Sequence, residues 1–266
     1  MDRSNDIEEL AELVAEEHWE SERVNPVEIA AASGITFNFG HYDDSFDGYL
    51  ECKSRKFHIY INLDTNKMAE APRARFSFAH ELGHYFLDWH RCALERGAPS
   101  HGSKADFVSP NVVEREADSF AASLLLPRNR MKQEAASKIT ADEVRRLAHR
   151  FGASLSATAI RCARLNLNSL IVMRWTGAGR AWCWSSSDMA EKTRNRAFRQ
   201  IDRIPEASPT RATLERQRPE SIGIRGTTLS TWFPSIRAGS SDDSILLEEC
   251  ISLGPHGALT LLRLAD

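Results

Sequence analysis

Residues 76–87 read FSFAHELGHYFL and place His80 and His84 four positions apart, with Glu81 directly after the first histidine. In an α-helix, residues four apart lie on one face with Cβ atoms about 5–6 Å apart, so two imidazoles can reach one metal ion at about 2.0–2.1 Å. Glu81 then projects beside that face, where it can take a proton from a water molecule on the metal. The stretch therefore predicts the helix of a zinc hydrolase.

The apolar residues of this stretch indicate which way the two histidines face. The histidines fall on the same helical stripe as the apolar positions, which are Phe76, Ala79, Gly83 and Leu87. Imidazoles on a buried face need polar partners, and one metal ion satisfies both of them. This context favours a metal site over a chance occurrence of the motif.

A second helix is predicted at residues 112–126, because Pro127 lacks the amide hydrogen that would continue it. One side of this helix combines two acids with small or apolar residues, namely Glu114, Ala117, Asp118, Ala121 and Leu125. A buried carboxylate is costly unless it is paired or binds a metal, so Glu114 is the predicted third ligand. Asp118 is expected to accept the other ring N–H of a liganding histidine. Glu116 faces the other way and is expected to be a solvated surface charge.

An alternative to metal binding by these acids remains open. Glu114 and Asp118 would form ordinary ion pairs if an arginine such as Arg73 or Arg75 lay beside them. That arrangement would neutralise the carboxylates without a metal.

The third ligand also has a rival in the sequence. His90 follows His80 by ten positions, a spacing at which a third histidine binds the metal when a glycine breaks the helix. Leu87 stands where that glycine would be, so a continued helix is expected to carry His90 away from the metal. Weaker candidates lie in the loop that follows, namely Cys92, Glu95 and His101.

The residues before the metal helix predict helices and a small sheet. Amphipathic helices are expected at 7–19 and 26–33, and a strand at 35–38. Apolar residues alternate with polar ones over 57–64, as in a half-buried strand, whose expected partner is 48–52 across a turn at 53–56. An edge of such a sheet could hold an extended substrate by main-chain pairing. The predicted fold class is α+β.

Residues 141–164 predict two helices joined by a short turn. Their arginines make the segment locally basic, so DNA binding is one interpretation: they are Arg145, Arg146, Arg150, Arg161 and Arg164. The other interpretation, preferred on the family resemblance given below, is that the two helices complete the hydrolase core or dock its substrate.

Residues 168–266 predict a β-rich accessory domain. A hairpin is expected at 170–184 across Gly177-Ala178-Gly179, and further strands at 227–233, 244–253 and 258–264. The polar stretch 191–218 is expected to be an exposed helix and linker. Core packing is preferred over a ligand pocket for the four tryptophans of this region, Trp175, Trp182, Trp184 and Trp232. The predicted division is therefore 1–130, 131–167 and 168–266.

Composition restricts the classes of partner and compartment. A net charge of −3 over 266 residues gives no general attraction to nucleic acid or anionic membrane. The acidic first twenty residues lack the apolar core of a secretory signal, and no apolar run is long enough to span a bilayer. Five scattered cysteines without C-x-x-C spacing indicate reduced thiols. We therefore expect a cytoplasmic protein.

Two stretches of the sequence resemble the ImmA/IrrE family of bacterial zinc metallopeptidases. They are residues 76–90, FSFAHELGHYFLDWH, and residues 114–127, EREADSFAASLLLP. The resemblance also covers 47–50 and 57–62 and extends loosely to about residue 167. It implies a zincin-like fold of gluzincin type, with His80, His84 and Glu114 as metal ligands and Glu81 as catalytic base. Asp118 departs from the family pattern, in which asparagine is more frequent, although either side chain accepts a hydrogen bond.

The resemblance implies a cytoplasmic enzyme that cuts helix-turn-helix repressors of the XRE type and so derepresses stress, phage or mobile-element genes. The accessory region resembles sensor-like domains of some members, which implies a small-molecule or stress signal there. Zn²⁺ is the expected cofactor, with Mn²⁺ as the alternative. Two other functions remain open, which are a non-catalytic zinc-containing anti-repressor or toxin–antitoxin component and a DNA-binding regulator. Candidates for a second donor to the oxyanion are Tyr60, Tyr85, His90 and His101.

Overall fold

The computed structural model describes residues 3–19, 22–66, 68–99, 102–103, 111–193, 201, 203–216, 222–240 and 243–265. His101, a weaker candidate from the sequence, lies outside this part of the chain. The contacts divide the protein into two compact units, one formed by Met1–Arg130 and Ala148–Ser154, the other by Met131–Leu147 and Leu155–Asp266. Helices and small sheets occur in both, so the predicted α+β class is confirmed. The domain boundaries drawn from the sequence stay predictions.

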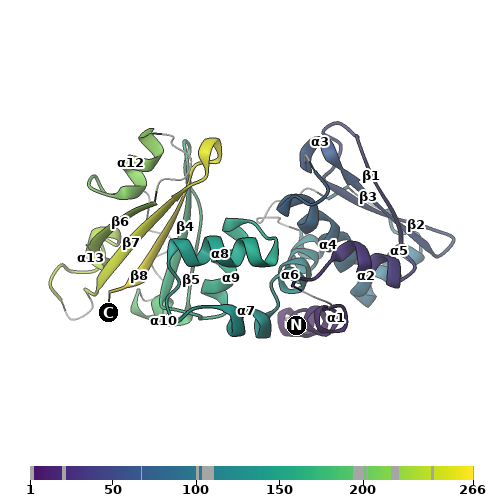
Figure 1. Ribbon diagram of the computed structural model, residues 1–266, viewed down its shortest axis with the longest axis horizontal. Coiled ribbons are helices and arrows are strands. Elements are labelled where there is room, and N and C mark those ends of the chain that lie inside the picture. The colour runs from purple at the N-terminus through teal and green to yellow at the C-terminus, as the bar shows by residue number, and fades with distance from the viewer. Residues whose placement is uncertain are drawn as a thin grey trace. The chain divides into compact units, whose positions relative to one another are not determined.

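The first unit combines helices with a three-stranded sheet (Figure 1). Its strands have the order β1-β3-β2, with β1 parallel and β2 antiparallel to β3. Because β3 is central, β2 lies at an edge of this sheet. The elements up to the second long helix are α1 (Ser4–Glu17), α2 (Pro26–Ala32), β1 (Thr36–Gly40), β2 (Gly48–Lys53), β3 (Lys56–Asn62), α3 (Leu63–Asn66), α4 (Pro72–Phe86), α5 (Asp88–Glu95) and α6 (Val112–Leu125).

The β2–β3 hairpin confirms the turn predicted at 53–56. Lys53 pairs with Lys56, and the two residues between them, Ser54 and Arg55, have φ values of 51° and 61°. Two successive left-handed residues are typical of the tight turns that match the twist of paired strands. The alternation of β3 places Ile59 and Ile61 in the core, where both are fully buried.

The metal helix α4 lies in the core between the sheet and α6. Pro72 occupies its first turn, where the missing amide hydrogen costs nothing. The side chain of Asn111 caps α6 by accepting a hydrogen bond from the Val113 amide at 3.0 Å. A Cβ added at Gly83 would lie 3.1 Å from the Cα and carbonyl oxygen of Ala117, so α4 and α6 pack backbone against backbone. Small residues at this crossing bring the functional faces of both helices together.

The second unit contains a five-stranded antiparallel sheet with the order β5-β4-β8-β7-β6 (Figure 1). The predicted hairpin at 170–184 is confirmed by β4 and β5. The strand expected at 227–233 is wrong after Thr228, because Thr228 caps a short helix there by accepting a hydrogen bond from the Thr231 amide. The elements from 128 onward are α7 (Arg128–Glu134), α8 (Ala141–Phe151), α9 (Leu155–Arg164), β4 (Leu170–Thr176), β5 (Gly179–Ser185), α10 (Ser187–Lys192), α12 (Pro209–Arg216), β6 (Ile222–Thr228), α13 (Leu229–Trp232), β7 (Ile245–Ser252), a 3₁₀ turn (Gly254–His256) and β8 (Ala258–Leu264).

The tryptophans of this unit divide between core and surface. Trp175 and Trp232 pack in its hydrophobic core, with ring centroids 6.3 Å apart, as preferred from the sequence. Trp184 is among the exposed large side chains, and Arg164 lies over its ring. Within the described residues, no helix has both the length and the apolar character needed to cross a membrane.

Candidate metal centre

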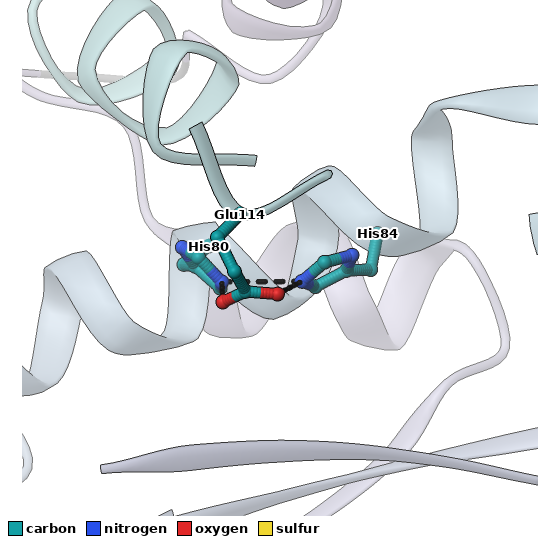
Figure 2. Close-up of side chains that lie close together, drawn as sticks. All are labelled: His80, His84 and Glu114. Atoms are coloured by element: carbon teal, nitrogen blue, oxygen red, sulfur yellow. Dashed lines mark hydrogen bonds and ion pairs between the residues drawn. The ribbon is translucent and has the colours of Figure 1, made fainter. Parts of the chain in front are cut away.

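Three side chains from α4 and α6 converge on one point. His80 and His84 project from successive turns of α4, and their Nε2 atoms are 3.1 Å apart. The Glu114 carboxylate reaches across from the first turn of α6, with Oε2 3.3 Å from His80 Nε2 and Oε1 3.5 Å from His84 Nε2. Figure 2 shows this carboxylate directed at both imidazoles. Residues 30 or more positions apart therefore form one cluster, as the helical spacing predicted.

The cluster has the dimensions of a metal site. Its ligand atoms all lie within 4.8 Å of one another. Ligands bound tetrahedrally at about 2.0–2.1 Å are separated by about 3.4 Å, which the measured separations match to within a few tenths of an ångström. Two histidines and one glutamate are also a set found in catalytic zinc sites, in which the fourth position stays open. The residues therefore fit a divalent cation such as Zn²⁺ or Mn²⁺.

Asp118 lies behind His80, on the side away from the cluster. Its Oδ1 is 2.8 Å from His80 Nδ1, the contact that the sequence predicted for a residue orienting a ligand. Burial lowers the pKa of His80, but hydrogen bonds to Asp118 and Glu114 outweigh it and raise the pKa to about 10. A cation that binds here would therefore displace a proton from His80.

The Glu81 side chain packs against β2, the edge strand of the sheet. Only 1% of its surface is exposed, and an added Cβ at Gly48 would lie 2.7 Å from its Oε1. The hydroxyl of Ser103 hydrogen-bonds Glu81 Oε1 and also lies 3.0 Å from the Gly48 carbonyl oxygen. The backbone of Ser103 pairs with the edge of β2, since its amide donates to Gly48 and its carbonyl accepts from Asp47. Sequence reasoning missed both Gly48 and Ser103, which no motif marks.

Comparison with known proteins places this part of the chain in a family. Residues 35–163 match the model of the M78 peptidases, described as an IrrE N-terminal-like domain. This part of the chain belongs to the ImmA/IrrE peptidase family. Membership indicates a metallopeptidase-type function and agrees with the resemblance read from the motifs.

One solved structure is similar over nearly the whole of this chain. It is described as a Mycobacterium tuberculosis transcriptional regulator, is 15% identical, and aligns with a TM-score of 0.56 over 99% of this chain and 90% of that chain. At this identity the likeness shows the fold alone. A search of curated proteins finds no match.

Two sequence interpretations of the ImmA/IrrE centre require correction, the first being the path of the chain after α4. The helix does not continue, because Leu87 adopts an extended conformation with φ −74° and ψ 105° and α5 begins at Asp88. Leu87 is completely buried, so core packing favours the bend although no glycine or proline marks it. His90 therefore returns to the centre, where its Nδ1 lies 3.1 Å from His84 Nδ1.

The second correction concerns Glu116, which is not a solvated surface charge. Its side chain is 15% exposed, and its Oε2 accepts hydrogen bonds from Trp89 Nε1 at 2.8 Å and from His90 Nε2 at 2.9 Å. Arg3 Nη1 lies 3.8 Å from the other carboxylate oxygen. Burial lowers the pKa of His90 despite this carboxylate.

The two arginines considered as ion-pair partners of Glu114 and Asp118 have other partners in this structure. Arg73 instead pairs with the buried carboxylate of Asp47 at 2.7 Å. Arg75 donates to two backbone carbonyls, Val24 at 2.7 Å and Gly152 at 3.1 Å. Both guanidinium groups are thus engaged away from the metal cluster.

The remaining candidates lie elsewhere or lack the geometry of a donor. The Tyr60 hydroxyl donates to Glu51 at 3.2 Å, and the Tyr85 hydroxyl lies 3.5 Å from the Ser33 carbonyl. Cys92 and Glu95 belong to α5 and are absent from the ligand cluster found among the described residues. No second oxyanion donor is therefore assigned.

Proposed function

We propose that the chain is a zinc-dependent endopeptidase that cleaves an XRE-type helix-turn-helix repressor in the cytoplasm and so derepresses stress, phage or mobile-element genes. The observation that carries the proposal is the convergence of His80, His84 and Glu114 with catalytic-site dimensions, where Glu81 follows the first of these residues on α4. Family membership supports the peptidase class, and the sequence resemblance supports the substrate class.

The cation, when bound, would polarise the scissile carbonyl and make a water molecule more acidic. Glu81 is the group that takes the proton of the attacking water at a carboxylate oxygen and returns it to the leaving amine. Its position is restricted by the Gly48 backbone on one side and by the Ser103 hydroxyl on the other. His80 and His84 keep their Nε2 atoms toward the cation because their Nδ1 atoms have partners.

The edge of β2 is the proposed binding strand for the substrate main chain. Ser103 shows that an antiparallel partner fits there, because it exchanges backbone hydrogen bonds with Gly48 and Asp47 at 2.9 and 2.8 Å. An extended segment in the same register would pass the carboxylate of Glu81. Peptide hydrolysis needs such a clamp, since main-chain pairing aligns the scissile bond without requiring a particular side chain.

DNA binding has less support than repressor cleavage. Arg146 of the basic segment is paired with Glu143 at 2.8 Å and lies 3.7 Å from Glu134, and Arg161 is only 3% exposed. Arginines engaged in this way contribute little to a phosphate-binding face.

The test is incubation of the zinc-loaded protein with the repressor encoded by the adjacent gene, with fragments mapped by mass spectrometry. The wild type is expected to produce discrete fragments. Glu81→Gln should bind zinc but not cleave, because an amide cannot accept the proton, whereas His84→Ala should lose both properties. Glu28→Gln is the matched control, since this exposed carboxylate on α2 accepts a hydrogen bond from Asn25 and lies outside the cluster. Repressor binding without fragments from any variant would favour a non-catalytic anti-repressor.

A further inference from the structure

The two histidines of the cluster are supported by different kinds of partner. His80 Nδ1 contacts a carboxylate directly, at 2.8 Å from Asp118. His84 Nδ1 contacts a second imidazole, and only the far side of that ring, His90 Nε2, reaches a carboxylate, Glu116. Four side chains thus form a line from the N-terminal segment to the cluster, in the order Arg3, Glu116, His90 and His84.

When the cation is bound, the hydrogen bonds along this line fix which ring nitrogens of His84 and His90 carry protons. A metal at His84 Nε2 requires the ring proton to sit on Nδ1, which then donates to His90 Nδ1. A neutral His90 that accepts at Nδ1 carries its own proton on Nε2 and donates it to Glu116. Every donor therefore meets an acceptor, and no alternative proton placement satisfies both contacts while His84 Nε2 faces the cation.

The environment makes this arrangement rigid. His90 is 4% exposed, and the bend at Leu87 fixes the start of the helix that carries it. Glu116 is held at the same time by Trp89, whose ring in turn lies under the guanidinium of Arg3 at 4.6 Å. A ring nitrogen with a fixed acceptor behind it keeps its orientation, and such support typically changes metal affinity about 10–100-fold.

We propose that His90 is a positioning residue of the metal centre, which accepts the Nδ1 hydrogen of His84 and is itself anchored by Glu116. This inference rests on the proposed metal site and goes beyond it, since His90 does not touch the cation. The line differs from the His80–Asp118 pair because its acceptor is a neutral ring, so His84 is the ligand whose orientation depends on a third residue.

The test compares Zn²⁺ affinity, measured by competition with a chromophoric chelator, and the visible spectrum of the Co²⁺-loaded protein. His90→Phe removes the acceptor and should lower Zn²⁺ affinity about 10–100-fold and shift the Co²⁺ bands. His90→Asn places an oxygen where Nδ1 stands and should restore affinity to within about tenfold of wild type. Glu116→Gln keeps an acceptor for His90 but not the charge, and should give a smaller loss than His90→Phe.

His41→Phe is the matched control, because His41 also contacts an acid, Asp64 at 2.6 Å, but is exposed and outside the cluster. It should leave both signals unchanged. Wild-type affinity and an unchanged Co²⁺ spectrum in His90→Phe would overturn the proposal. If that variant does not fold, wild-type affinity in Glu116→Gln, for which the proposal expects a loss, would do the same. A wild-type protein that binds neither cation would instead contradict the proposed metal site itself.

Discussion

Substitution of Gly48 by alanine should separate the catalytic step from metal binding. An added Cβ would lie 2.7 Å from Glu81 Oε1, 3.1 Å from Cγ and 3.3 Å from Cδ, whereas ordinary contacts begin at 3.4 Å. The carboxylate would therefore have to move by about 0.7 Å, the difference between 2.7 and 3.4 Å. A misplacement of about 1 Å in a catalytic group can cost about 10²-fold in rate. We expect kcat to fall by one to two orders of magnitude.

The fold should tolerate this change. The closest atom is the end of a flexible side chain, and the backbone of Gly48 is not in the left-handed region that favours glycine. Replacing glycine by alanine at a compatible site stabilises a protein by about 0.4–1 kcal/mol through the unfolded chain. We therefore expect the Tm to stay the same or rise slightly. Zn²⁺ affinity should also be retained, because the added methyl group is directed at the base and not at the three ligands.

The assay measures kcat on the cleaved repressor at saturating substrate, together with Zn²⁺ affinity and Tm of the same preparations. Gly226→Ala is the matched control, since an added Cβ there meets no atom within 4 Å. A Gly48→Ala protein that cleaves at the wild-type rate would refute the assignment of Glu81, in this position, as the base. Loss of Zn²⁺ binding with a normal Tm would refute the claim that Gly48 acts only on Glu81.

Three further predictions concern the supports of the centre. Gly83→Val should lower the free energy of unfolding by about 1–3 kcal/mol and weaken Zn²⁺ binding, because the valine side chain would push away the helix that carries Glu114. Urea unfolding measures the first effect and Zn²⁺ titration the second. An unchanged Zn²⁺ affinity would contradict the link between helix packing and metal binding. His80 has a pKa raised to about 10 and so holds a proton at neutral pH, which Zn²⁺ must displace. Apparent Zn²⁺ affinity should therefore rise about tenfold per pH unit between pH 7 and 9, and a flat profile by chelator competition would argue against a protonated site. Burial raises the pKa of Cys162, Cys183 and Cys250, so iodoacetamide followed by peptide mass mapping should find these three thiols labelled more slowly than the partly exposed Cys52 and Cys92.

The convergence of His80, His84 and Glu114 could be predicted in part from the sequence, because helical geometry is local. The spacing of His80 and His84 fixes their relative direction once a helix forms, and both histidines lie in α4 (Pro72–Phe86). The same arithmetic placed Glu114 and Asp118 on one face of the second helix, and these two side chains indeed reach the imidazoles. Only the meeting of the two helices required tertiary information.

The surroundings of His84 could not be predicted, because they depend on which elements cover α6. A helical wheel divides residues into two sides, and it put Glu116 on the side opposite Glu114. In the protein that side is covered as well, by Trp89 and His90 from α5 and by Arg3 at the start of α1. A charge that looks solvated on an isolated helix is therefore enclosed by partners distant in sequence.

The position of Glu81 shows a more general limit of motif reasoning. The motif specifies that a glutamate follows the first histidine. The position of the glutamate's carboxylate, however, depends on the close approach of Gly48 and on a hydrogen bond from the hydroxyl of Ser103. Neither Gly48 nor Ser103 belongs to a recognisable sequence motif. Both affect Glu81 because the fold brings them close to its carboxylate. Because Ser103 pairs with the strand edge proposed for the substrate, a substrate that took its place would also replace the hydrogen bond to Glu81. The orientation of the Glu81 carboxylate would then depend on what occupies the edge, which links substrate binding to the position of the catalytic group.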